Sequence, residues 1–364
     1  MQRRHLVRTV AVPLTALLVL AACSDDGGPV AGGGGATSKE VLTSIADGVI
    51  LPSYEALTVN LTALDSSLAT LCQSPTADAL ATSRARWRDT ELAWESTRAA
   101  GVGPAIQQRA MGAIAFRARA DKVEAILTGG GPVDSTSLSE LGADVRGIYA
   151  IEIALFGGGG EALDTAAGHR RCTYASSVAD LAITASQAVL EAWADGTDGG
   201  AAYRDTFIAG MDGKPTASLA SVVNEMAFRL QQIDDQGVRA FAAAATPEDL
   251  PASRREGPGA YGVASLRGIL GGIAAVVRGP DGEPGLAALV RSHSGDTADR
   301  LEDLTTQAVD ALRDLPDSSA AALTHHRAVV RAAEAVAALR VLVTTEVASQ
   351  LGVTIGFSDA DGDS

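Results

Sequence analysis

Residues 319–351 read SAAALTHHRAVVRAAEAVAALRVLVTTEVASQL, and this pattern decides the fold. Alanine and aliphatic residues recur at spacings of three and four, which is typical of a helix with one buried face. The segment contains neither glycine nor proline, the residues that most readily interrupt a helix. It follows Asp317 and Ser318, whose side chains can cap the first turn. We therefore expect a long helix here.

The same pattern recurs from Lys39 onward, with breaks rich in Gly, Pro, Asp and Ser between the segments. Only 4% of the residues are aromatic, so Ala, Leu, Val and Ile must build the core, and this favours packed helices over sheets. No convincing alternating strand of five or more residues appears. We predict an all-α fold of packed antiparallel helices, with a boundary near residues 195–200. The expected helices cover residues 39–71, 76–100, 104–128, 138–156, 172–195, 218–245, 259–278, 296–314 and 319–351.

The charge balance excludes one class of partner. The 364 residues include 29 basic and 44 acidic side chains, which gives a net charge of −15 and a pI near 4.7. An acidic surface repels phosphate backbones, so we expect no nucleic-acid binding.

Residues 1–23 have the features of a lipoprotein export signal. Three arginines precede a short apolar stretch, and Leu-Ala-Ala at 20–22 followed by Cys23 matches a lipobox. The alternatives are a plain secretory signal or a membrane helix, although the apolar stretch is short for spanning a bilayer. We expect residues 1–22 to be a removed signal peptide, Cys23 to carry lipid, and residues 23–38 to be a flexible linker. The protein would then be lipid-anchored in the cell envelope, on the periplasmic side of an outer membrane or the outer face of a cytoplasmic membrane.

The cysteine count has a consequence for an exported chain, which has access to oxidising chemistry. Once Cys23 is lipidated, Cys72 and Cys172 remain as an even pair. We favour a disulfide between them, closing a loop of about 100 residues and stabilising the fold by up to about 4–5 kcal/mol. The alternative is two unrelated buried thiols.

Residues 147–156, GIYAIEIALF, form an apolar segment that contains one acidic residue, Glu152. Burial of a carboxylate is costly unless it is paired, bound to a metal or protonated. Tyr149 lies three residues earlier and therefore on the same helix face, and Arg146 is a candidate partner in the preceding turn. Two interpretations stay open: a functional site, or an ion pair with an arginine of a neighbouring helix that fixes packing.

On these residues the chain resembles the imelysin-like family of envelope proteins, whose hallmark is Gly-x-His-x-x-Glu. Here the hallmark stands as Gly147-Ile-Tyr149-Ala-Ile-Glu152, with Tyr149 in the histidine position. The resemblance covers roughly residues 40–363. Further matching pieces follow one another in order: Leu71-Cys72, Arg84-Ala-Arg-Trp87, Ala93-Trp94-Glu95, Gly103-Pro104, Arg170-Arg171-Cys172, Leu266-Arg267-Gly268 and the segment from Leu351 to Phe357.

The resemblance implies two packed helical-bundle domains, residues 39–197 and 198–364, with the hallmark residues in a cleft between them. It implies a role in iron or other metal handling in the envelope, and some members are encoded near dihaem oxidoreductases. The family was named for a peptidase activity. Tyr149 removes the best zinc ligand, however, and Glu152 alone cannot hold a catalytic zinc, which needs three protein ligands. A phenolate with a carboxylate would suit Fe(III) better.

We therefore expect a lipid-anchored envelope protein that binds a metal, iron above all, or a small ligand in the cleft, as part of iron uptake, rather than an enzyme. The alternatives are a scaffold for an envelope oxidoreductase and, less well supported, a metallopeptidase. Beside the hallmark, Glu95 and Arg98 lie one turn apart on one predicted helix, and their other interpretation is a solvated salt bridge. Candidate ligand-binding or metal-binding residues are Tyr149, Glu152, Glu95 and Arg98, together with Asp359 and Asp361 of the acidic tail.

Overall fold

The structure is a computed structural model, and it describes residues 35–157, 165–196, 200–210, 213–250, 257 and 259–356. Every regular element in these ranges is a helix and none is a strand, so the predicted all-α class is confirmed. Cys23, Asp359 and Asp361 lie outside the described residues. The division into two domains at residues 197–198 stays a prediction.

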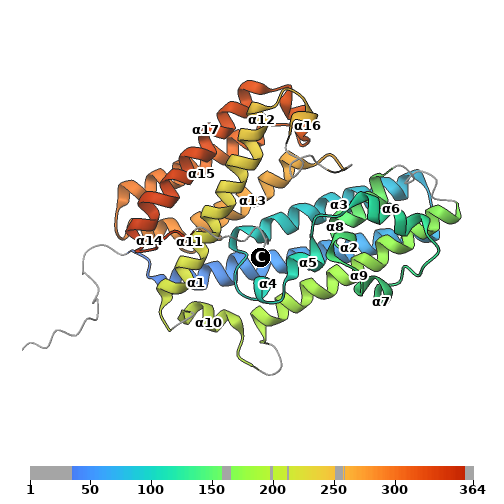
Figure 1. Ribbon diagram of the computed structural model, residues 1–364. Coiled ribbons are helices and arrows are strands. Elements are labelled where there is room, and N and C mark those ends of the chain that lie inside the picture. Colours follow the sequence, from blue (N-terminus) through green and yellow to red (C-terminus); the bar gives the residue numbers. More distant parts are fainter. Residues whose placement is uncertain are drawn as a thin grey trace, which may run out of the picture. The chain divides into compact units, whose positions relative to one another are not determined.

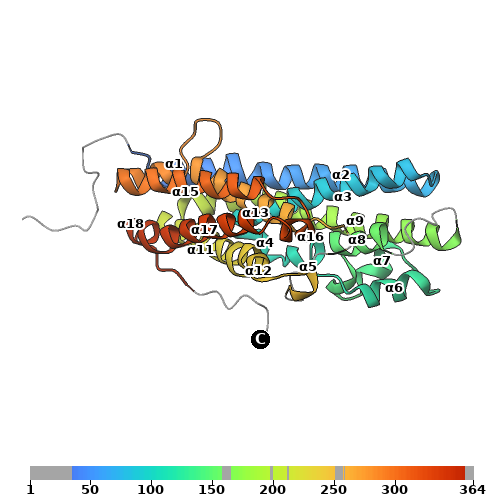
Figure 2. The ribbon, with the colours of Figure 1, turned by 90° about the horizontal axis from the view of Figure 1, so that it is seen from above.

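The helix α2 (Leu51–Gln73) packs against both α3 (Ala77–Thr97) and α9 (Ala166–Ala194), and these long helices run together in both views (Figure 1 and Figure 2). A disulfide between Cys72 and Cys172 joins α2 to α9, with the two Cα atoms 5.5 Å apart. Its two cysteines lie 100 positions apart in the sequence. The bond links α2 to α9 covalently and so holds these two helices together.

A second group contains α11 (Pro215–Gln231), α13 (Gly262–Arg278), α15 (Gly295–Arg313) and α17 (His326–Leu342). In this group α15 packs against both α13 and α17, and α11 contacts α17. The helix α13 also packs along α3, which brings residues from the two halves of the sequence together (Figure 1). The site described below lies at this α3–α13 contact.

Three long helices pass through a π-helical turn without ending. The predicted helices over 39–71 and 218–245 are confirmed, each as a continuous helix with one π-helical turn. The predicted helix over 319–351 also contains such a turn, but its first residues form a separate short helix, α16 (Ser319–Leu323). Such turns often occur at functional sites. The three π-helical turns in the described residues are Ala46–Ile50 between α1 (Ser38–Ile45) and α2, Gln232–Val238 between α11 and α12 (Arg239–Ala243), and Val343–Val347 between α17 and α18 (Ala348–Gln350).

The prediction of one helix over residues 104–128 is wrong. The segment forms three short helices, α4 (Pro104–Gln107), α5 (Ala110–Ile114) and α6 (Ala120–Thr128). Arg109, between α4 and α5, has a φ of 51°, in the left-handed region that a helix cannot contain. Two further short helices, α10 (Tyr203–Ala209) and α14 (Leu286–Arg291), carry too little periodic sequence to have been predicted.

The predicted helix over residues 138–156 is also divided, into α7 (Ser135–Ser139) and α8 (Ile148–Phe156). The hallmark glycine explains where α8 begins. Gly147 has a φ of +79°, and a Cβ at this position would lie 2.6 Å from the carbonyl oxygen of Ile114. Both the backbone conformation and the close approach therefore require glycine.

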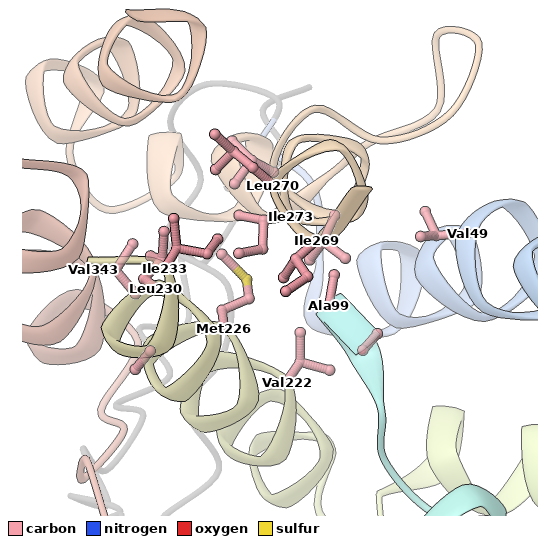
Figure 3. Packing of buried hydrophobic residues seen from close by; sticks show 14 of the residues in the cluster. Val49, Ala99, Val222, Met226, Leu230, Ile233, Ile269, Leu270, Ile273 and Val343 are labelled. Atoms are coloured by element: carbon pink, nitrogen blue, oxygen red, sulfur yellow. The ribbon is translucent and has the colours of Figure 1, made fainter. Parts of the chain in front are cut away.

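Buried apolar side chains form two clusters. The larger contains residues from Val41 to Val353, and the smaller contains residues from Leu64 to Ala179. In the larger cluster, side chains of α11 and its π-turn, such as Met226 and Ile233, face Ile269 of α13 (Figure 3). Aliphatic residues supply most of both clusters, as the low aromatic content predicts.

Candidate functional site

A cavity of about 520 Å³ lies among α3, α8 and α13, which is a size typical of small-molecule sites. The residues that line it come from both sides of the predicted domain boundary at residues 197–198. The residues that line it are Trp87, Glu91, Glu95, Arg98, Arg117, Ala118, Ala120, Tyr149, Glu152, Ile153, Phe241, Gly257, Tyr261, Gly262, Ser265, Leu266, Ile269 and Ser319.

One face of α3 contributes three of these side chains. Trp87, Glu91 and Glu95 follow one another at intervals of four residues, which places them in a row along the helix. The Trp87 indole donates a hydrogen bond of 2.7 Å to the backbone oxygen of Ile148, at the start of α8. The Ser265 hydroxyl of α13 donates to Glu91. The row therefore connects α3 to both of its neighbours at the cavity.

The hallmark tyrosine lies against the carboxylate of Glu95. The Tyr149 hydroxyl donates to Glu95 Oε1 at 3.0 Å, and Arg98 Nη1 forms an ion pair with Glu95 Oε2 at 2.6 Å. The Glu95 side chain is 2% exposed and the Arg98 side chain is 20% exposed, so the carboxylate of the pair is buried and the guanidinium lies partly in contact with water. Each carboxylate oxygen of Glu95 thus has a partner within the protein.

Tyr149 is a neutral phenol in this setting. Burial raises the pKa of its hydroxyl well above the usual value, and the nearby carboxylates of Glu95 and Glu91 raise it further. The positive charge of Arg98 lowers this pKa, but by less than burial and the two carboxylates together raise it. In the metal-free protein the Tyr149 hydroxyl therefore keeps its proton and donates it to the hydrogen bond with Glu95.

Arg98 connects the cavity to a second buried ion pair. Its Nη2 donates to Gln232 Oε1 at 3.0 Å, and Arg229 Nη1 donates to the same oxygen at 2.7 Å. Arg229 also pairs with Glu225 at 2.6 Å. Burial and the positive charge of Arg98 both lower the pKa of Arg229. The neutral side-chain oxygen of Gln232, in the π-turn after α11, therefore accepts hydrogen bonds from the guanidinium groups of both Arg98 and Arg229.

Glu152 points toward the backbone of the segment before α13. Its Oε1 accepts a hydrogen bond of 2.7 Å from the Gly259 amide, and the side chain is buried, with the residue 6% exposed. Arg146 is not its partner, because Arg146 donates instead to the backbone oxygen of Ser139 at 2.9 Å. The reason is geometric, since Gly147 turns the chain between Arg146 and α8.

The structure thus brings together four of the sequence-predicted site residues: Tyr149, Glu152, Glu95 and Arg98. Sequence reasoning missed the rest of the polar lining, including Glu91, Arg117 and Ser265. The four-residue spacing of Trp87, Glu91 and Glu95 is a signal that could have revealed Glu91. Ser265 and the glycines before α13 become relevant only through tertiary contact.

The donor set does not fit a bare metal ion. Within the described ranges, no group of three or more His, Cys, Asp or Glu side chains could hold one. Both oxygens of Glu95 already have partners within the protein. The three protein ligands that a peptidase zinc site requires are not brought together by these residues.

Comparison with known proteins identifies the family. The family model for imelysin matches residues 50–345, which is most of the chain. The chain belongs to the imelysin family. No curated protein is similar enough in sequence to match.

Two solved structures share the fold. One is a putative iron-regulated protein A precursor from Parabacteroides distasonis, with a TM-score of 0.74, 17% identity, and coverage of 89% of this chain and 98% of the other. The second is an imelysin-like protein from Psychrobacter arcticum, with a TM-score of 0.68, 18% identity, and coverage of 88% and 97%. At these identities the likeness extends to the fold alone. Among the described helices of this imelysin-family chain, none is both long and apolar enough to cross a membrane.

Proposed function

We propose that this member of the imelysin family is a lipid-anchored envelope protein that binds a small polar ligand in its cavity, in an iron-related role. The observation that carries the proposal is the convergence of Glu91, Glu95, Tyr149 and Glu152 on one cavity, with Arg98 beside them. Buried carboxylates are costly to maintain, and their concentration at a cavity is typical of a binding site.

The aromatic and apolar part of the lining supports a molecular ligand rather than an ion. Trp87, Tyr261 and Phe241 line the cavity together with the carboxylates. Small-molecule sites commonly combine such walls with a few polar groups that fix orientation. Because the described residues offer no donor set for a bare ion, iron would enter as a complex that brings oxygen ligands of its own.

The iron-related role draws on the relatives, one of which is titled an iron-regulated protein A precursor. The anchor draws on the lipobox that ends at Cys23. Mass spectrometry of the membrane-extracted protein should find an acylated N-terminal Cys23, and Cys23→Ser should release the chain from the membrane. An unmodified chain that begins elsewhere would contradict the anchor.

The ligand is tested by titration of the unlipidated chain from Ser24 onward. Ferric citrate, citrate alone, Fe(II), Fe(III), Zn(II) and Cu(II) are each offered, and binding is followed by calorimetry. We expect saturable binding of ferric citrate that weakens at least tenfold in Arg98→Met, because the complex is an anion and Arg98 is a cation of the cavity lining. Site-specific binding of a bare ion, lost in Glu152→Ala and Tyr149→Phe, would replace this proposal with a metal site at the hallmark. Binding of no probe would contradict a ligand site for iron.

A further inference from the structure

Arg98 has more hydrogen-bond donors than its surroundings have acceptors. A guanidinium group carries five N–H donors and no acceptor. Nη1 of Arg98 donates to Glu95 and Nη2 donates to Gln232, whereas its buried Nε has no acceptor among the described residues. The Arg98 side chain lines the cavity and is 20% exposed. Part of this cation is therefore available to a ligand that supplies oxygen atoms.

Gln232 lies between two guanidinium groups and adds no charge to them. Its Oε1 accepts from Arg98 Nη2 at 3.0 Å and from Arg229 Nη1 at 2.7 Å. The amide must present its oxygen to both groups, because a guanidinium cannot accept a hydrogen bond. In the described residues, the ion-pair partner of Arg98 is Glu95 and that of Arg229 is Glu225. Gln232 thus holds both arginines without providing either with a further carboxylate.

The two guanidinium groups also act on one another electrostatically. Burial and the positive charge of Arg98 both lower the pKa of Arg229. The side chains of Arg229 and Glu225 are 13% and 14% exposed, so water screens the charges here only in part. A change of charge at Gln232, which contacts both arginines, should therefore be felt strongly at Arg98.

The charged groups of the cavity are distributed along α3. Trp87 and Arg98 are eleven positions apart in the sequence, which corresponds to about 16 Å along a helix. Glu152 lies near Trp87, because a Cβ on Gly259 would lie 2.7 Å from the Trp87 ring and 2.8 Å from Glu152 Oε1. At the Arg98 end, both oxygens of Glu95 already have partners. This end therefore offers a ligand N–H donors rather than acceptors.

We propose that Arg98 binds a carboxylate group of the ligand, and that Gln232 is the positioning residue that holds Arg98 for this contact without neutralising it. Gln232 is not among the described residues that line the cavity, so it acts through Arg98. The inference rests on the proposed ligand site and adds the class of ligand, a compound with a free carboxylate that faces the Arg98 end of the cavity.

Gln232→Glu separates the two roles of this position. Its carboxylate can still accept from both guanidinium groups, so the midpoint of urea unfolding should not fall. A further carboxylate beside Arg98 should nevertheless weaken the binding of citrate about tenfold or more, measured by calorimetry on the unlipidated chain from Ser24 onward. Gln232→Met removes the acceptor, so it should lower the unfolding midpoint but weaken citrate binding less than Gln232→Glu does.

Gln231→Glu is the matched control. It adds the same charge at the neighbouring position, but Gln231 is exposed, so water and salt screen the new carboxylate. This variant should bind citrate as the parent chain does. A purely structural role of Gln232 predicts the opposite order, with the larger loss of binding in Gln232→Met.

Parental affinity for citrate in Gln232→Glu would overturn the proposal, and so would a larger loss in Gln232→Met than in Gln232→Glu. If Gln232→Glu does not fold, Arg98→Lys and Arg98→Met serve instead. The lysine variant keeps a cation and should bind citrate more tightly than the methionine variant, and equal affinities would overturn the proposal. Absence of citrate binding by the parent chain would also overturn it. Citrate binding that iron does not strengthen would contradict the iron-related role and leave this inference standing.

Discussion

The hydroxyl of Tyr149 donates a 3.0 Å hydrogen bond to the carboxylate of Glu95, across the contact between α8 and α3. The tyrosine stands at the position where the family hallmark has histidine. Because Glu95 also pairs with Arg98, the hallmark side chain belongs to a buried network that extends to Gln232 in the π-turn after α11. The hallmark thus connects the two halves of the sequence through hydrogen bonds.

Tyr149→Phe removes only the hydroxyl of this contact. We expect a loss of about 1–2 kcal/mol of unfolding free energy, since Glu95 keeps its ion pair with Arg98. Urea unfolding followed by circular dichroism measures it. A variant as stable as the parent would show that the hydrogen bond contributes nothing net.

Glu95→Ala leaves the guanidinium of Arg98 buried without its carboxylate. We expect a destabilisation of about 3–5 kcal/mol, larger than that of Glu95→Gln, whose amide oxygen still accepts from Arg98. Combining Glu95→Ala with Arg98→Met in a double-mutant cycle measures the interaction energy between Glu95 and Arg98. Strict additivity of the two single changes would contradict a direct interaction between Glu95 and Arg98.

Gly147→Ala places a methyl group 2.6 Å from the backbone oxygen of Ile114, at a φ of +79°. We expect a destabilisation of about 1–3 kcal/mol. Gly271→Ala is the matched control, because Gly271 lies within α13 and nothing lies within 4 Å of its added Cβ. The control should stabilise the protein by about 0.5–1 kcal/mol through helix propensity. A melting temperature that does not fall in Gly147→Ala, or that falls in Gly271→Ala, would contradict this expectation.

The disulfide should contribute to stability without shaping the cavity. Cys72→Ala with Cys172→Ala frees a loop that spans 100 positions of sequence, so we expect a loss of about 2–5 kcal/mol. Treatment of the parent chain with a reductant should produce a comparable drop in melting temperature. An unchanged melting temperature in both experiments would show that the bond is not formed in solution.

Stability should fall in alkaline solution. Burial raises the pKa of Tyr174, whose hydroxyl donates to the backbone oxygen of Val145 at 2.7 Å. A raised pKa means that the folded state keeps this proton while the unfolded chain releases it near pH 10, so the stabilisation is present below pH 10 and is lost above it. Tyr174→Phe should reduce the slope above about pH 10 by up to ~1.4 kcal/mol per pH unit. An identical slope would contradict the assignment.

Much of the fold follows from local pattern. The long helices were predictable because alanine and aliphatic residues recur with helical spacing, and the cysteine count alone suggested pairing Cys72 with Cys172. The failure over residues 104–128 has a local cause that composition does not reveal, since Arg109 adopts a left-handed conformation more usual for glycine.

The site was predictable only in part. Tyr149 and Glu152 stood out because one acidic residue lies in an apolar helix, whereas Glu91 lies in a helix with many charges and gave no contrast. The pairing of Glu152 with Gly259 joins residues 107 positions apart, and no local rule predicts such a contact. The protonated state of Tyr149 likewise depends on carboxylates that only the fold brings near.

We propose that the cavity lined by Tyr149, Glu95 and Glu152 receives iron as a complex. The most direct test is an anomalous difference map at the iron edge, from crystals of the mature chain grown with ferric citrate. We expect a peak inside this cavity, with citrate oxygens coordinating the iron. A peak at another place, or iron coordinated directly by Tyr149 and Glu152 without citrate, would contradict it.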